Sequence, residues 1–190
     1  DLESGKVELS IEKVEVFKSG RATKTKRRNK MIYAGTGHRP PKLGGYSLDN
    51  QEKLFKFAQK ILSELPQPIE LIISGMALGW DQALALAATE LRVSFKAAIP
   101  FEGQERMWPQ RSQENYRALL KCASKVVVVS EGGYSSQAMQ DRNIWMVDNA
   151  DHILALWDGT LGGTRNCLQY VKEEGLPWTN YWNQWLGFNK

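Results

Sequence analysis

Four glycine-rich segments carry the side chains of this chain that are best placed to do chemistry. Each follows a short apolar run, and the last three lead into a helical pattern. Glycine lets a ligand approach the backbone closely, and the free N–H groups of such turns bind anions. Four such turns at one edge of one sheet predict a nucleotide-type pocket. The segments are Gly35-Thr36-Gly37-His38-Arg39, Gly75-Met76-Ala77-Leu78-Gly79-Trp80-Asp81, Glu131-Gly132-Gly133-Tyr134 and Asp158-Gly159-Thr160-Leu161-Gly162-Gly163-Thr164.

The first two segments combine charged, titratable and aromatic side chains. Arg39 can clamp a phosphate, because a guanidinium group matches phosphate oxygens bidentately. His38 titrates near neutral pH and can act as an acid or base, but a structural or ligand hydrogen bond is the favoured role. Asp81 either caps the helix that it opens or accepts a hydrogen bond from a ribose or base. Trp80 either stacks on a base or covers the core.

The last two segments offer a stacking surface and an anion site. Tyr134, beside a glycine pair, can stack on a base. The Gly162-Gly163 pair precedes a helix, so its amides and the positive helix end favour an anion, to which Thr164 can donate a hydrogen bond. An ordinary tight turn is the alternative. Asp158 either holds this turn or binds a sugar hydroxyl.

Further candidates lie at the same predicted edge. Glu102 and Glu131 are the candidate catalytic acids for glycosidic-bond chemistry, and a solvated loop carboxylate is the alternative for both. The Pro100-Phe101 pair closes a strand at this edge and is a candidate ligand contact. The Arg142-Asn143 pair lies inside a helix, on an arc that faces either the pocket or a neighbouring subunit. Because this helix mixes large apolar groups with charge, it is compatible with a homo-oligomer.

Apolar runs and helical patterns alternate from residue 31 onward. This alternation implies right-handed crossovers and a mostly parallel sheet of five or more strands, with helices on both faces. Ligands bind at the carboxyl ends of such strands, which is where the glycine segments stand. We expect Asp49 to cap the first helix. The predicted strands span residues 31–34, 71–74, 95–99, 125–129 and 152–157, and the predicted helices span 48–65, 81–91, 112–122, 136–149 and 164–174.

The net charge of +4 comes from the N-terminal segment. Residues 1–30 carry nine Lys/Arg against five Asp/Glu, whereas residues 31–190 carry 16 of each. A solvated basic linker is the favoured interpretation, and weak phosphate-backbone or partner contact is the alternative. The neutral body does not favour nucleic acid as the main ligand. We predict a basic appendage with some β-structure over residues 1–30, because apolar residues alternate there, and a single ligand-binding domain with an aromatic C-terminal tail over residues 31–190.

The remaining composition limits the compartment and the cofactors. No apolar run reaches the roughly 18 residues that a membrane helix needs, and no secretory signal is visible, so we expect a cytoplasmic protein. Cys122 and Cys167 have no paired spacing, and we expect two buried thiols in a reducing compartment. The two histidines of the chain, His38 and His152, lie outside any ligand-spaced cluster, so the sequence predicts no metal and no cofactor.

Five motifs, in order along residues 31–175, resemble the YpsA-like family of the SLOG superfamily, whose relatives include the DprA and LOG (cytokinin-activating) families. The resemblance implies a Rossmann-like three-layer α/β/α fold and a pocket for a nucleotide or nucleotide-derived molecule, but no defined reaction. The motifs are Thr36-Gly37-His38-Arg39-Pro40, Gly75-Met76-Ala77-Leu78-Gly79-Trp80-Asp81, Ile99-Pro100-Phe101 with Gln104 and Trp108, Arg142-Asn143 with Met146-Val147-Asp148, and Leu156-Trp157-Asp158-Gly159 with Gly162-Gly163-Thr164.

One departure from the LOG pattern bears on chemistry. LOG-type phosphoribohydrolases carry GGxGTxxE, in which a helical Glu serves the cleaved N-glycosidic bond. Here Asn166 or Leu168 stands where that acid would be sought. Asn166 can hydrogen-bond a ribose hydroxyl, but an amide does not stabilise an oxocarbenium ion as a carboxylate does.

Three functions therefore remain open from the sequence. The favoured one is a sensor or sequestering protein that binds an ADP-ribose-like or similar nucleotide derivative at the carboxyl edge of the sheet. The first alternative is an N-glycosidic-bond hydrolase of the phosphoribohydrolase type. The second is a DprA-like nucleic-acid binder that uses the basic segment.

Overall fold

A single sheet of seven strands runs through the computed structural model, which describes residues 11–13, 30–66 and 68–189. The strand order is β1-β5-β4-β3-β2-β6-β7, and every pairing is parallel. The chain builds outward from β2 to β5 and then returns to the other side of β2, so the order reverses between β2 and β6. The strands are β1 (Ile11–Lys13), β2 (Met31–Gly37), β3 (Ile69–Ser74), β4 (Phe95–Ile99), β5 (Lys125–Val128), β6 (His152–Leu156) and β7 (Trp178–Asn180).

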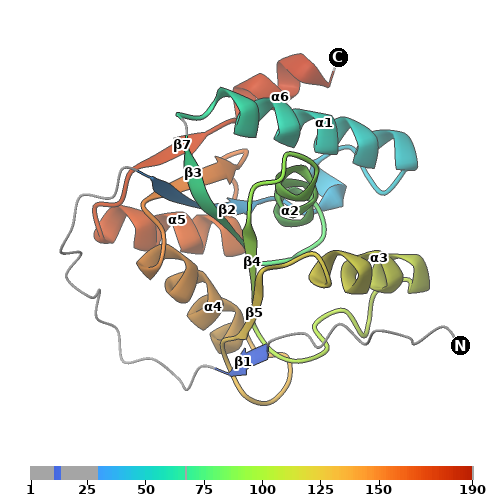
Figure 1. Ribbon diagram of the computed structural model, residues 1–190, viewed down its shortest axis with the longest axis vertical. Coiled ribbons are helices and arrows are strands. Elements are labelled where there is room, and N and C mark those ends of the chain that lie inside the picture. Colours follow the sequence, from blue (N-terminus) through green and yellow to red (C-terminus); the bar gives the residue numbers. More distant parts are fainter. Residues whose placement is uncertain (1–10, 14–29, 67, 190) are drawn as a thin grey trace, which may run out of the picture.

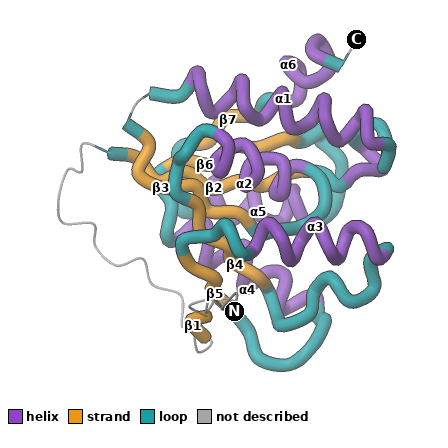
Figure 2. The backbone as a smooth tube through the Cα atoms, turned by 45° about the vertical axis from the view of Figure 1, so that its right-hand side comes forward, coloured by secondary structure: helices purple, strands orange, loops and turns teal. Residues whose placement is uncertain are grey.

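Helices cover both faces of this sheet, as Figures 1 and 2 show. One core packs side chains of α1, α2, α3 and α6 against the sheet, and a second core packs those of α4 and α5 against the other face. The predicted three-layer α/β/α fold is therefore confirmed. The helices are α1 (Leu48–Glu64), α2 (Trp80–Glu90), α3 (Gln110–Leu120), α4 (Ser136–Asp148), α5 (Gly163–Glu173) and α6 (Trp182–Phe188), with a 3₁₀ turn η1 (Pro40–Lys42).

The edges of the sheet hold elements beyond the five predicted strands. β1 pairs with β5, so residues 11–13 of the predicted N-terminal appendage join the main sheet. The remainder of residues 1–29 lies outside the described residues. The aromatic tail forms β7 and α6, and Trp185 of α6 packs its ring 5.4 Å from that of Phe57 in α1.

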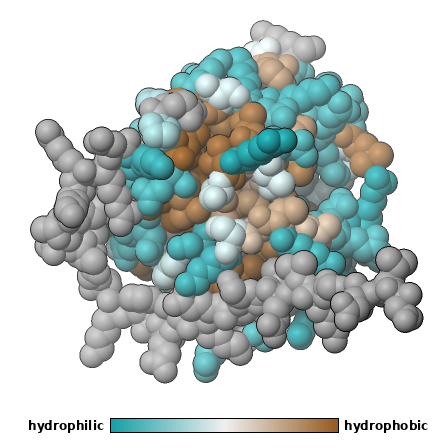
Figure 3. All heavy atoms as spheres, viewed as in Figure 1, coloured by the Kyte–Doolittle hydropathy of each residue, from teal (hydrophilic) through white to brown (hydrophobic). Residues whose placement is uncertain are grey.

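An apolar cavity of about 410 Å³ lies between α1, α2 and α3. Figure 3 shows apolar side chains gathered around α2 on the face of the molecule that Figure 1 presents. Cys122 lines the cavity and is exposed, which corrects the expectation that both thiols are buried. The helix predicted over 112–122 lies two residues earlier, at Gln110–Leu120, so Cys122 falls in the following turn. Within the described part of the chain, no helix is both long enough and apolar enough to span a membrane.

The N-cap of α1 is Ser47 rather than Asp49. The Ser47 side chain accepts a hydrogen bond from the N–H of Asn50, whereas Asp49 lies in the first turn and pairs with Lys53 at 3.1 Å. Replacing Ser47 by Ala should lower the free energy of unfolding by about 1 kcal/mol, because it removes the partner of an N–H that the helix cannot satisfy. Urea unfolding measures this loss. Ser63→Ala, on the exposed side of the same helix, is the matched control, and an equal loss there would contradict the cap.

Candidate functional site

A cleft of about 950 Å³ opens at the carboxyl edge of the sheet, where the strand order reverses between β2 and β6. Its walls come from the end of β2, from η1 and from the loop before α5. Asp81 of α2 and residues spread along α4 and α5 also line it. Parallel strands end at the same edge, so the fold brings residues that are more than a hundred positions apart into one site.

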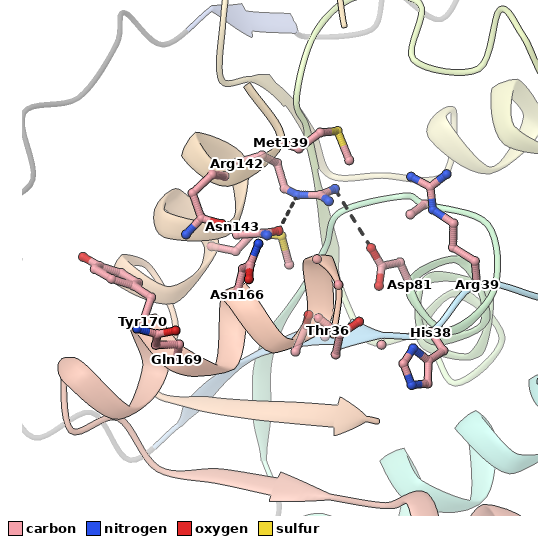
Figure 4. A pocket seen from close by; sticks show the side chains of 18 of the residues that line it. Thr36, His38, Arg39, Asp81, Met139, Arg142, Asn143, Asn166, Gln169 and Tyr170 are labelled. Atoms are coloured by element: carbon pink, nitrogen blue, oxygen red, sulfur yellow. Dashed lines mark hydrogen bonds and ion pairs between the residues drawn. The ribbon is translucent and has the colours of Figure 1, made fainter. Parts of the chain in front are cut away.

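The cleft gathers many of the residues that the sequence singled out. Figure 4 shows Arg142, Asn143 and Asn166 on one side, Asp81, Arg39 and His38 on the other, and Thr36 between them. The predicted residues that line the cleft are Gly35, Thr36, Gly37, His38, Arg39, Asp81, Tyr134, Arg142, Asn143, Gly162, Gly163, Thr164 and Asn166. The predicted residues outside its lining are Gly75, Met76, Gly79, Trp80, Pro100, Phe101, Glu102, Glu131, Gly132, Gly133 and Asp158.

Two of the glycines outside the lining have close neighbours that leave no room for a side chain. A Cβ at Gly75 would lie 2.1 Å from Nη1 of Arg142, so only a hydrogen atom fits beside that guanidinium. Gly79 has φ +99°, and its Cβ would lie 2.5 Å from the His38 carbonyl oxygen. Trp80 is fully buried and donates from Nε1 to the Leu154 carbonyl oxygen at 3.0 Å, so its ring belongs to the core.

The floor of the cleft holds a buried pair of opposite charges. Arg142 and Asp81 are each 5% exposed, and Nη1 of Arg142 lies 4.0 Å from Oδ2 of Asp81. Burial raises the pKa of Asp81 to about 6, although Arg142, the N–H of Ala77 and Arg39 act in the opposite direction. Burial also lowers the pKa of Arg142. A carboxyl group that titrates near neutral pH inside a cleft is a recurrent feature of functional sites.

A hydrogen-bond network joins the η1 side of the cleft to the loop after β6. Nε2 of His38 lies 2.6 Å from Oδ1 of Asp158, and Lys42 contacts both Asp158 and Thr160. Oδ1 of Asp158 also accepts from the N–H and hydroxyl of Thr160, at 2.9 and 2.6 Å. Asp158 therefore holds the loop before α5 in place beside His38, without lining the cleft itself.

The same contacts set the titration of this network. Burial acts to raise the pKa of Asp158, but hydrogen bonds from Thr160, His38 and Lys42 outweigh it and hold the pKa below its usual value. Burial lowers the pKa of His38 in spite of the neighbouring carboxylate. The network therefore keeps Asp158 ionised at neutral pH.

Replacing Asp158 by Asn should lower the melting temperature at neutral pH, because the amide loses the charge that holds Lys42 and one acceptor oxygen. A depressed pKa contributes stability above the unfolded value of about 4, and this stability is lost as the pH falls below it. The deficit should therefore shrink as the pH falls below about 4. Thermal unfolding across this range measures it, with Asp141→Asn, which alters a carboxylate that accepts from Gln137 outside this network, as the control. A deficit that does not vary with pH would contradict the ionised network.

Several residues that line the cleft were not predicted from the sequence. Lys42 belongs to η1, and Gln169, Tyr170 and Glu173 lie on α5. With Asn166, the three α5 residues follow steps of three and four, so they share one helix face. That polar periodicity is the signal that could have found them. Within the described residues, no group of three His, Cys, Asp or Glu side chains is arranged to hold a metal ion.

A parallel sheet with helices on both faces and a cleft at its switch point defines the Rossmann-like α/β class. The model of the YspA SLOG family, named YpsA, matches residues 33–182, and the chain belongs to this family. The resemblance stated from the motifs is thereby confirmed.

Relatives of this chain include two proteins of Bacillus subtilis strain 168. The SPbeta prophage-derived protein YoqJ is 31% identical, over 65% of this chain and 84% of YoqJ. The UPF0398 protein YpsA is 26% identical, over 67% of this chain and 76% of YpsA.

Two solved structures share the fold at low identity. DprA from Streptococcus pneumoniae superposes with a TM-score of 0.54 at 18% identity, over 80% of this chain and 50% of DprA. The chain thus spans half the length of that protein. TM1055 superposes with a TM-score of 0.51 at 15% identity, over 78% of this chain and 72% of TM1055. At such identities the likeness is one of fold.

Proposed function

We propose that the cleft binds a nucleotide or nucleotide-derived molecule, such as an ADP-ribose-like signal, and that the protein acts as its sensor or sequestering agent. One observation carries the proposal: first-turn residues of α2, α4 and α5 line the same cleft as Arg39, Lys42 and Arg142. Helix N-termini and guanidinium groups both favour phosphate oxygens. The cleft therefore suits a ligand with at least one phosphate.

The N-terminus of α5 is the best candidate for a phosphate subsite. Its N-cap is Gly162, which supplies no capping side chain, so the first amides of the helix remain available to a ligand. Thr164 lines the cleft in the first turn of the helix and adds a hydroxyl. Lys42 and Arg39 stand at the neighbouring wall.

The side of the cleft between α4 and α5 suits a base or sugar. Asn143, Asn166 and Gln169 bring neutral amides that can both donate and accept hydrogen bonds. Tyr134 is 76% exposed and lines the cleft, where its ring can cover a planar base. A volume of about 950 Å³ lies within the usual range for small-molecule sites.

Binding without cleavage is favoured over hydrolysis by the position of the acids. Glu102 and Glu131 do not line the cleft. The carboxylates that do line it are Asp81, which pairs with Arg142, and Glu173, which accepts from Gln169 at 3.0 Å. Glu173 is thereby engaged along α5, and Asp81 lies on the buried floor beside its counter-charge Arg142.

Native mass spectrometry of freshly purified protein, followed by calorimetry with a panel of nucleotides, tests the proposal. We expect an intact ligand bound with a Kd in the micromolar range or tighter. Release of free base from any nucleotide would favour the hydrolase instead. Binding of single-stranded DNA without any nucleotide binding would favour the DprA-like alternative.

A further inference from the structure

On the cleft floor, the Arg142 guanidinium is hydrogen-bonded to neutral acceptors rather than to the Asp81 carboxylate. Arg142 donates from Nη1 to the Gly75 carbonyl oxygen and from Nε to Oδ1 of Asn143, at 3.1 Å for the latter. Its distance of 4.0 Å to Oδ2 of Asp81 is longer than a hydrogen bond. Arg142 is thus positioned by two neutral acceptors, and Asp81 neutralises its charge without binding it directly.

This arrangement places a negative charge where an anionic ligand would bind. Both side chains line the cleft, so an anion that reaches Arg142 also comes close to the Asp81 carboxylate. Like charges repel strongly in a poorly hydrated site. A proton on Asp81 removes this repulsion and leaves the full charge of Arg142 to the ligand. Because burial already raises the pKa of Asp81 to about 6, taking up that proton requires little work near neutral pH.

Apart from His38, the ionisable groups around Asp81 do not change their charge in the same pH range. Arg39 after β2 and Arg142 of α4 stay charged. Burial raises the pKa of Cys167 of α5 to about 11 and also raises the pKa of Tyr116 of α3, which faces Arg142, so both stay neutral. His38 lines the same cleft, and its pKa is lowered by burial, so it must be separated from Asp81 by experiment.

We propose that Arg142 and Asp81 form a proton-coupled anion subsite, in which an anionic group of the ligand binds Arg142 while a carboxylate oxygen of Asp81 takes up one proton from solvent. The inference rests on the proposed function in that it takes the ligand to be anionic. The Asp81 carboxylate thereby competes with the anionic ligand for the positive charge of Arg142. Affinity for the anion therefore rises as the pH falls, and levels off once Asp81 is protonated in the free protein.

Sulfate is the probe that isolates this effect, because it stays a dianion over the whole range and carries no base or sugar. NMR titration at constant ionic strength should show the sulfate Kd of the wild type rising about tenfold per pH unit above about pH 6, and little below it. Asp81→Asn should bind sulfate about as tightly at pH 8 as the wild type does near pH 5.5, with a flat profile. Asp141→Asn changes the net charge equally outside the cleft lining and should keep the wild-type profile.

Two results would overturn the subsite. One is a wild-type sulfate affinity that does not change between about pH 6 and 8. The other is a pH dependence that persists in Asp81→Asn, which would assign the proton to His38 or another group. If the variant proves unstable, proton uptake on binding sulfate is compared in the wild type and in His38→Gln by calorimetry in buffers of different ionisation enthalpy, and uptake that disappears with the imidazole would overturn the assignment to Asp81. Sulfate binding with this profile in a protein that binds no nucleotide would sustain the subsite and refute the nucleotide proposal.

Discussion

Replacing Gly79 by alanine should cost about 4 kcal/mol of the free energy of unfolding, a large part of the stability of a domain of this size. Gly79 has φ +99° and ψ −127°, a conformation that residues with a side chain rarely adopt. Its added Cβ would lie 2.5 Å from the carbonyl oxygen of His38 and 3.0 Å from Cα of Arg39. These are backbone atoms, so the clash cannot be relieved by a rotamer change.

The clash lies where the start of α2 is hydrogen-bonded to the residues that follow β2. The same His38 carbonyl accepts the N–H of Trp80, the first residue of α2, at 3.3 Å. The alanine would therefore separate the start of α2 from the end of β2, two elements that line the cleft. Loss of Trp80 packing in the core would follow.

Gly45→Ala separates the steric cost from the cost of the backbone conformation. Gly45 has φ +100°, yet nothing lies within 4 Å of its Cβ position. We expect this control to lose about 1 kcal/mol, from the unfavourable φ alone. Chemical denaturation of both variants measures the difference. Equal losses would show that the contact between Gly79 and the end of β2 carries no stability of its own.

The sheet was largely predictable because its central strands are buried on both faces and read as continuous apolar runs. Residues 125–129 include four consecutive valines, and this run contains β5, whose last three residues are buried. β7 has three residues, too few for a periodic signal, and its pairing with β6 depends on the folded tail. Alternation around Ile11 indicated β-structure, but no local pattern specifies β5 as its partner.

The place of the site in the fold was predictable from the sequence, but the residues that line it were predictable only in part. Strand order decides which loops share an edge, so the glycine segments could be placed near one another. Whether each loop reaches the ligand depends on packing from distant residues. Gly75 packs against the guanidinium of Arg142, which lies 67 residues later and donates a hydrogen bond to the Gly75 carbonyl oxygen. Glu102 follows a strand at the correct edge, but its loop does not line the cleft.

Arg142→Met should have the largest combined effect on stability and binding. Removing one partner of a buried ion pair typically costs about 3–5 kcal/mol, because the remaining charge loses its compensation. Asp81 would then stay buried without its nearest cation, and its pKa would rise further above the present value of about 6. Anion binding at the floor of the cleft should fall below detection in the sulfate titration.

The stability loss should depend on pH in a definite direction. A carboxyl group whose folded-state pKa exceeds its unfolded value favours folding at low pH, and this contribution disappears as the pH rises through the folded-state pKa. In the wild type the decline ends near pH 6, whereas in Arg142→Met it continues to higher pH. The stability gap between the two proteins should therefore be smallest below about pH 6 and should widen above it.

The double variant Arg142→Met/Asp81→Asn distinguishes this electrostatic cause from loss of packing. It removes the uncompensated charge and keeps the methionine, so it should recover at least half of the lost stability and show no widening above about pH 6. Sulfate binding should stay absent, because Arg142 is missing in both proteins. Urea unfolding of the single and double variants at about pH 5.5 and 8 gives the comparison. If the double variant is no more stable than the single one at the higher pH, the buried charge of Asp81 is not what makes Arg142 necessary to the fold.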